Sequence, residues 1–140
     1  MPQRYAGDVT PKEAWNILGT EKDSYLVDCR TAAEWSFVGV PNISALGKEA
    51  TFAEWVRFPG GINNPDFVND VKNAGVGSNA TILFLCRSGQ RSIDAAIAMS
   101  EAGYPNSYNI LEGFEGDKNE NSQRGTVGGW KLSELPWQQN

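Results

Sequence analysis

The clearest structural signal lies in residues 81–85, Thr81-Ile82-Leu83-Phe84-Leu85. This run is β-branched, aromatic and apolar almost throughout, which is typical of a strand buried on both faces of a parallel sheet. A short polar turn follows it. The next segment, about Ser92–Ala102, places apolar side chains at helical spacing until Gly103 and Pro105 end the pattern. These residues therefore predict a buried strand, a tight turn and a helix.

The segments on either side continue this alternation of strands and helices. Upstream, the sequence predicts a helix at Pro11–Gly19 capped by Thr10, a strand at Tyr25–Asp28, a short helix with the capping box Thr31 to Glu34, a short edge strand at Val40–Ser44 and a helix after Asn64-Pro65-Asp66. Downstream, it predicts a strand at Tyr108–Leu111, a polar loop at 112–129 and an apolar end, Trp130–Trp137, that packs back on the domain. We therefore expect an α/β fold, an open parallel sheet of about five strands with helices on both faces.

The least regular part of the chain is residues 45–64. Aromatic side chains such as Phe52, Trp55 and Phe58 make it too apolar for a solvated linker. We predict a partly helical insert packed on the body of the domain. Trp55 and Phe58, together with Trp35, either line the entrance to a site or belong to the core.

Length and charge narrow the classes of function. A chain of 140 residues is expected to form one domain, and with 40% apolar residues it can bury a core. The net charge of -5, with no block of basic residues, argues against nucleic acid and anionic membranes as partners. The longest apolar run, Ala80–Cys86, is too short to span a bilayer, and the first residues lack the apolar stretch of a secretory signal. We expect a cytoplasmic protein.

Two features of composition narrow the chemistry. The chain has no histidine, which excludes Ser-His-Asp and Cys-His catalysis and histidine-ligated zinc. Its two cysteines, Cys29 and Cys86, form no Cys-x-x-Cys pair, so we expect neither a structural metal site nor a cofactor. In the absence of an export signal, both thiols are expected to be reduced.

The residues after the central strand carry the strongest functional signal, Cys86-Arg87-Ser88-Gly89-Gln90-Arg91-Ser92. A cysteine ending a core strand is usually only a small buried side chain. Here, however, backbone amides of a tight turn, the N-terminus of a helix and two arginines follow it, and each favours the thiolate over the thiol. We predict that Cys86 is a nucleophile and that residues 87–92 form an anion-binding loop.

Three further residues are weaker candidates. Asp28 ends a neighbouring strand and is either a turn residue or a partner that orients a loop arginine. Arg30 either supports the site or forms an internal salt bridge. Cys29 is expected mainly to pack in the core, with a role as a second, resolving thiol as the alternative.

The loop from Cys86 to Ser92 resembles the active-site loop of rhodanese-like domains, the sulfurtransferase homology family. Two other segments resemble signatures of that family, Leu26-Val27-Asp28-Cys29-Arg30 with Glu34-Trp35, and Gly103-Tyr104-Pro105 with the residues 108–114. Trp130 and Leu135-Pro136-Trp137 resemble the residues that usually end the domain in that family. The similarity implies one rhodanese-like domain over residues 1–140, with a core at about 8–137. The segment Gly39-Val40-Pro41-Asn42 departs from the family pattern, which often has a histidine there.

The resemblance implies a sulfurtransferase mechanism. Cys86 would take the outer sulfur of a small anionic donor such as thiosulfate, hold it as a persulfide, and pass it to cyanide, to a thiol or to a protein acceptor. Arg87 and Arg91 would attract the donor, Ser88 and Ser92 would donate hydrogen bonds, and Gly89 would permit the tight turn.

Two other functions remain as alternatives. Cysteine phosphatases and arsenate reductases use a loop of the form Cys-x5-Arg, whereas Cys86 and Arg91 are one residue closer, which suits a sulfur atom better than a phosphoryl group. A persulfide carrier, or a regulatory module without turnover, is the alternative from a different class. The intact loop argues against a module that has lost its chemistry.

Overall fold

The fold is an open parallel sheet flanked by helices, seen in a computed structural model that describes residues 4–57, 62–124 and 126–139. Five strands form the main sheet in the order β1-β8-β7-β2-β4, and all four neighbouring pairs are parallel. Their bounds are Gly7–Val9 (β1), Ser24–Asp28 (β2), Thr51–Phe52 (β4), Thr81–Leu85 (β7) and Ser107–Ile110 (β8). The predicted α/β architecture with five parallel strands is confirmed.

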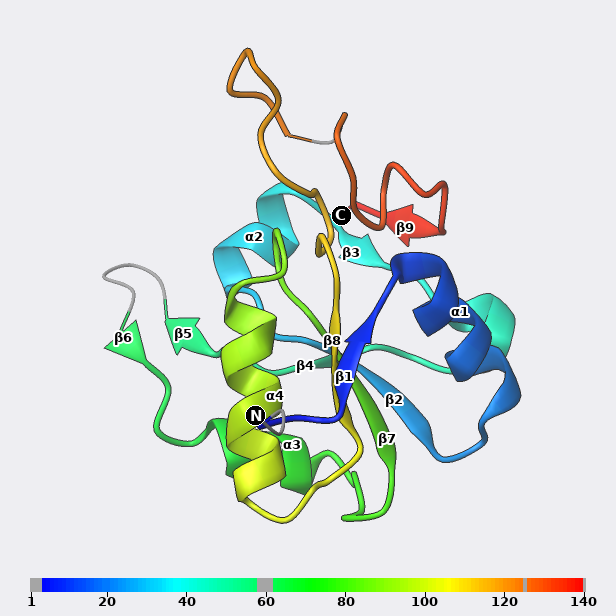
Figure 1. The fold of residues 1–140 in the computed structure, drawn as a ribbon, viewed down its shortest axis with the longest axis vertical. Helices are drawn as coiled ribbons and strands as arrows, with labels where there is room; N and C mark the ends of the chain where they lie inside the picture. The colour runs from blue at the N-terminus through cyan, green and yellow to red at the C-terminus, as the bar shows by residue number, and fades with distance from the viewer. Residues whose placement is uncertain (1–3, 58–61, 125, 140) are drawn as a thin grey trace.

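Helices cover both faces of this sheet (Figure 1). They are α1 (Pro11–Thr20), α2 (Ala32–Phe37), α3 (Phe67–Asn73) and α4 (Arg91–Glu101). Both predicted capping boxes are present: the Thr10 side chain accepts from the amide of Glu13, and the Thr31 side chain accepts from that of Glu34. Each box satisfies two backbone donors that a helix start leaves unpaired.

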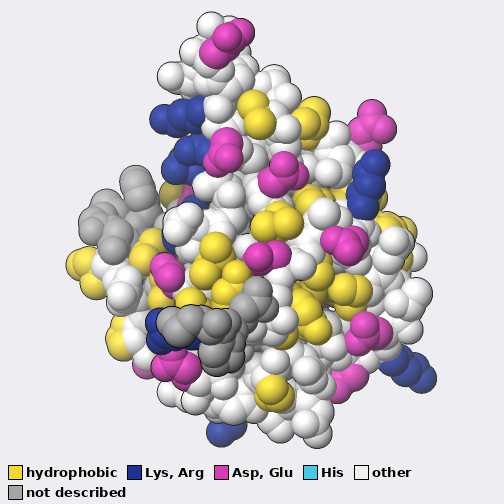
Figure 2. Space-filling view, viewed as in Figure 1, with side chains coloured by type: hydrophobic (Ala, Val, Ile, Leu, Met, Phe, Trp, Pro, Cys, Tyr) yellow, Lys and Arg dark blue, Asp and Glu magenta, His cyan; other side chains and the backbone are white. Residues whose placement is uncertain are grey.

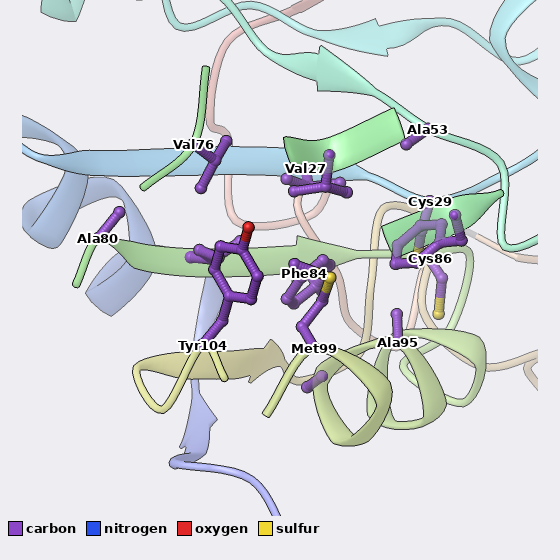
Figure 3. Packing of buried hydrophobic residues seen from close by; sticks show 14 residues of the cluster. Val27, Cys29, Ala53, Val76, Ala80, Phe84, Cys86, Ala95, Met99 and Tyr104 are labelled. Atoms are coloured by element: carbon purple, nitrogen blue, oxygen red, sulfur yellow. The ribbon is translucent and has the colours of Figure 1, made fainter. Parts of the chain in front are cut away.

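Two apolar clusters hold the layers together. One packs the β2–β7 face against α3 and α4, with Phe84 in contact range of Phe67 and Met99 in the same cluster (Figure 3). The other joins the opposite face to α1 and to Trp130, a fully buried side chain from the C-terminal segment. The predicted return of the C-terminus is therefore present, and β9 (Trp137–Gln138) completes it by pairing antiparallel with β3 (Val40–Pro41).

The structure corrects two local predictions. The strand expected at Val40–Ser44 is reduced to β3 and lies outside the main sheet, because Pro41 cannot donate a ladder hydrogen bond and a 3-10 turn begins at Ser44 (Ser44–Leu46). The insert at 45–64 is helical only at its start, in the 3-10 turn, and its other regular elements in the described residues are short strands. It contributes β4 to the sheet edge and the hairpin of β5 (Val56–Arg57) with β6 (Ile62–Asn63). Phe58 lies outside the described residues.

The insert is nevertheless packed on the body, as predicted. Trp55 packs against the α3 side of the core, with its ring 5.1 Å from that of Phe67. Trp35 and Phe52 stack edge to face at 5.1 Å. These contacts give Trp55 a core role and leave Trp35 beside the sheet edge.

Two surface properties complete the description. Acidic and basic side chains are spread over the face drawn in Figure 2, where the lysines and arginines form no continuous patch. None of the helices in the described ranges combines the length and hydropathy needed to cross a membrane.

Candidate active site around Cys86

Cys86 lies directly after β7, the middle strand of the sheet, at the edge where the parallel strands end. In this class of fold, ligands bind beyond that edge. The side chain is 1% exposed, and the register pairs Asp28 with Leu85, so Cys29 and Cys86 follow on adjacent strands. Figure 3 shows the two cysteines side by side at this edge.

Two groups contact the sulfur of Cys86. The backbone N–H of Gly89 donates to Sγ at 3.1 Å, and Ser92 Oγ lies 3.2 Å from Sγ. Gly89 has a φ of 102°, in the region that favours glycine, and a Cβ there would lie 3.1 Å from the backbone nitrogen of Glu112. The expectation that Gly89 permits a tight turn is met, and the turn aims an amide at the sulfur.

Arg91 is held by Glu34. Its two terminal nitrogens donate to the two carboxylate oxygens of Glu34 at 2.7 and 2.9 Å, which ties α4 to α2 beside the loop. Burial alone would raise the pKa of Glu34, but the Arg91 and Thr31 hydrogen bonds outweigh it and lower that pKa. The charge of Arg91 beside the loop is thus already paired with a carboxylate.

The other loop residues are more open. Arg87 and Gln90 are exposed and Ser88 is half-buried. Arg87 forms no ion pair with another residue in the described ranges. It is therefore the loop arginine whose charge is available to a ligand.

The two supporting candidates pair with each other. Arg30 donates through Nε and a terminal nitrogen to the two Asp28 oxygens at 2.9 and 2.7 Å, and both side chains are fully buried. The same arginine reaches the carbonyl of Gly39 at 2.8 Å and lies over the ring of Phe114. Asp28 therefore does not orient a loop arginine; its closest cation is the one two residues away, because the chain turns back at the end of β2.

Cys29 packs in the core, as expected. Its thiol is fully buried and donates to the carbonyl of Leu85 at 3.3 Å. Burial raises the pKa of Cys29, and the neighbouring Cys86 and Asp28 add to the effect. This environment keeps its proton on sulfur and makes it a poor nucleophile beside Cys86.

Three residues of the site were identified from the sequence only as parts of family signatures, without a role in the site. Asn109 accepts from Ser92 Oγ at 2.5 Å, and Glu34, which was also predicted as a helix cap, pairs with Arg91. Gly113 packs closely against the loop, since a Cβ there would lie 2.4 Å from the Cys86 carbonyl oxygen. The pairing of Glu34 and Arg91, 57 positions apart, left no signal in the sequence.

A cavity of about 470 Å³ lies between α2, β3 and β4. Its lining includes Trp35, Phe52, Lys48 and Asn42, but not Cys86. Within the described part of the chain, no group of three acidic or sulfur ligands is arranged to hold a metal ion.

Comparison with known families agrees with this geometry. Residues 10–120 match the family description of the rhodanese-like domain. The chain belongs to the rhodanese-like domain family. Cys86, the four-residue spacing to Arg91 and four of the five parallel strands lie within that matched region, and β1 lies just before it.

Two curated relatives align with 94% of this chain. An uncharacterized protein of Rickettsia conorii is 36% identical over 134 residues, covering 94% of this chain and 96% of the relative. The chloroplastic rhodanese-like domain-containing protein 4 of Arabidopsis thaliana is 30% identical, but this chain spans only 25% of it.

Two solved structures place the fold. The crystal structure of a protein from M. tuberculosis is 43% identical, with a TM-score of 0.89 and coverage of 97% of this chain and 99% of that one. The polysulfide-sulfur transferase homodimer of Wolinella succinogenes has a TM-score of 0.66 at 18% identity, covering 98% of this chain and 80% of that one. The latter likeness is one of fold.

Proposed function

We propose that this protein is a sulfurtransferase that moves a sulfane sulfur from an anionic donor such as thiosulfate through a persulfide on Cys86. The observation that carries the proposal is the position of the sulfur, at the end of the central strand with the Gly89 amide aimed at it. A backbone donor of this kind favours negative charge on the sulfur, both as thiolate and as persulfide. The solved polysulfide-sulfur transferase of the same fold supports this choice of chemistry.

The reaction divides into two displacements. The Cys86 thiolate attacks the outer sulfur of thiosulfate, and a bond forms between Cys86 Sγ and that outer sulfur. The sulfur–sulfur bond within thiosulfate breaks, and sulfite leaves with its electron pair. Cyanide or a thiolate then attacks the outer sulfur of the persulfide, and the Cys86 thiolate leaves with its electrons. No metal, cofactor or external oxidant is needed for either step.

Groups around the loop assist both steps. The amides of Ser88 and Gln90 donate to no other residue in the described ranges, so they can serve the bound anion. Arg87 supplies the unpaired charge that attracts the donor and steadies the departing sulfite. Arg91, already paired with Glu34, fixes the loop against α2 and adds less net charge.

The phosphatase alternative fits the loop less well. A phosphoryl group in transfer needs donors around three equatorial oxygens, whereas the loop places only four residues between Cys86 and Arg91. A single sulfur atom needs no such ring. Cysteine phosphatases also protonate their leaving group, and no acid in the loop is suited to that step.

The test is the intact mass of the protein after treatment with thiosulfate. We expect the mass of one added sulfur, located on Cys86 and removed by cyanide. Cys86→Ser should show no addition, while the matched variant Cys29→Ser should retain most of the loading, because its thiol is buried and protonated. Equal loss in both variants would contradict the assignment.

A second arm of the same experiment separates the alternatives. An aryl phosphate at equal protein concentration should give no turnover above the Cys86→Ser background. Phosphate release that depends on Cys86, without a persulfide, would favour a phosphatase. Loading by thiosulfate without transfer to cyanide or small thiols would instead favour a carrier that needs a protein acceptor.

A further inference from the structure

A continuous chain of hydrogen bonds links the reactive sulfur to an acidic side chain on the outermost strand. Ser92 Oγ lies 3.2 Å from Cys86 Sγ and donates to Asn109 Oδ1 at 2.5 Å. The other end of the same amide, Asn109 Nδ2, donates to Asp8 Oδ1 at 3.0 Å. Ser92 and Asn109 are buried, and Asp8 is exposed on β1, in register with Asn109 on β8.

The donor and acceptor in each of these hydrogen bonds are determined by Asp8, at the outer end of the series. An ionised carboxylate can only accept hydrogen bonds. Asp8 therefore requires the NH2 group of Asn109, which turns the amide oxygen of Asn109 toward Ser92. That oxygen in turn takes the only hydrogen of the Ser92 hydroxyl, so Ser92 offers the sulfur lone pairs and not a proton.

We propose that Asp8 is a positioning residue for Cys86, holding Asn109 and Ser92 in the orientation in which Ser92 accepts the S–H hydrogen. The family resemblance implied that Ser92 donates a hydrogen bond, and in the structure its hydroxyl hydrogen goes to Asn109. In the resting protein, this series of hydrogen bonds stabilises the thiol form of Cys86. A thiolate or persulfide can accept a hydrogen bond from Ser92 only if Ser92 stops donating to Asn109, whose oxygen then loses a buried hydrogen bond.

The other charged and titratable groups near these hydrogen bonds leave their donor and acceptor roles unchanged. Tyr5 donates its hydroxyl to Asp8 at 2.8 Å, and burial, assisted by Asp8, raises the pKa of Tyr5, so the phenol stays a neutral donor. The Cys29 thiol donates its hydrogen bond to the Leu85 carbonyl, and Arg91, on α4, is paired with Glu34. Arg87, next to Cys86, is exposed.

Asp8→Asn removes the constraint with little change in shape. An asparagine at position 8 can donate, so the Asn109 amide can reverse and donate to Ser92, which frees the Ser92 hydrogen for the sulfur. One neutral hydrogen bond then favours the thiolate, and we expect about a three- to tenfold larger thiolate fraction near neutral pH. The midpoint of the curve of alkylation rate against pH should fall accordingly.

The experiment follows iodoacetamide alkylation of Cys86 against pH, assigned by peptide mass, in four proteins and one control variant. These are the native protein, Asp8→Asn, Ser92→Ala and the double variant. Asp23→Asn, which removes an exposed charge at the opposite end of β2, is the matched control and should leave the midpoint unchanged. Thermal unfolding confirms that each variant is folded.

The double variant distinguishes this mechanism from simple loss of negative charge. If Asp8 acts through Ser92, then Asp8→Asn should have no effect on the midpoint in the Ser92→Ala background. A full shift in that background, or no shift in Asp8→Asn alone, would overturn the proposal. It rests on the proposed function only in naming Cys86 as the reactive group; since alkylation needs no sulfur donor, failure of sulfur transfer would be seen separately.

Discussion

At the scale of single residues, the site depends on one backbone conformation. Gly89 occupies a φ of 102° so that its N–H faces the Cys86 sulfur. Both hydrogen-bond contacts of the Cys86 sulfur come from residues close in sequence, Gly89 and Ser92, which is why residues 86–92 could be predicted as a loop. The contact of Asn109 with Ser92 could not be predicted, because it depends on the pairing of β8 with β7, although Asn109 lies in the family signature at 108–114.

Gly89→Ala should therefore impair sulfur loading. The new Cβ requires a strained backbone and would lie 3.1 Å from the Glu112 nitrogen, so the amide moves away from the sulfur. We expect loading by thiosulfate to slow by about tenfold or more, which corresponds to about 1.4 kcal/mol in the barrier.

Gly103→Ala is the matched control for this variant. Gly103 has a similar φ of 99°, but a Cβ added there would meet no atom within 4 Å, and the residue lies at the far end of α4. It should lose comparable stability in urea unfolding and keep the native loading rate. A similar slowing in both variants would mean that strain in general, and not the Gly89 amide, limits the reaction.

At the scale of elements, the pair of Glu34 and Arg91 fastens α2 to α4. Both side chains are largely buried, so breaking the pair leaves a guanidinium without its carboxylate. Glu34→Gln keeps the cap of α2, since glutamine also serves in a capping box. We expect a loss of about 1–3 kcal/mol in the free energy of unfolding near neutral pH.

The same pair predicts a dependence on pH. Because folding lowers the pKa of Glu34, its stabilising contribution is present above the unfolded-state pKa and is lost as pH falls through the folded-state pKa. The native protein should thus lose more stability on acidification than Glu34→Gln does. Glu120→Gln, an exposed loop variant, should follow the native curve. Parallel curves for the native protein and Glu34→Gln would refute this role.

Elements differ in how well the sequence predicted them, for physical reasons. The helices α1 and α2 were predicted within one or two residues at the helix ends, because capping boxes are local signals. The strands β1 and β4 were missed. Each has only two or three residues, and neither Gly7–Val9 nor Thr51–Phe52 shows an apolar pattern, since each is extended only through its pairing with β8 or β2. Asp8 lies on one of these missed strands.

At the scale of the whole molecule, the C-terminal segment closes the apolar core opposite α4. Trp130 is fully buried, its ring 6.1 Å from that of Trp15 on α1, and its indole N–H donates to the Pro136 carbonyl at 2.8 Å. The next tryptophan, Trp137, is 40% exposed, in β9. The two residues have the same side chain and lie in the same segment, so they differ mainly in burial.

Trp130→Ala should therefore be far more damaging than Trp137→Ala. The first variant leaves a large cavity next to α1 and removes the indole hydrogen bond to Pro136, and such truncations cost about 3–5 kcal/mol. The second loses a ring that packs on Phe114 and lies over the Lys131 ammonium at 3.9 Å, with water already on one side, and should cost about 1 kcal/mol. Urea unfolding followed by circular dichroism measures both values.

The C-terminal segment also bears on the reactive loop, because Phe114 donates its amide to the Cys86 carbonyl at 2.7 Å. A destabilised C-terminal segment should therefore loosen the loop, and Trp130→Ala should slow sulfur loading even where it remains folded. Equal losses of stability in the two variants would show that the segment is held by its β3–β9 pairing and not by the buried indole.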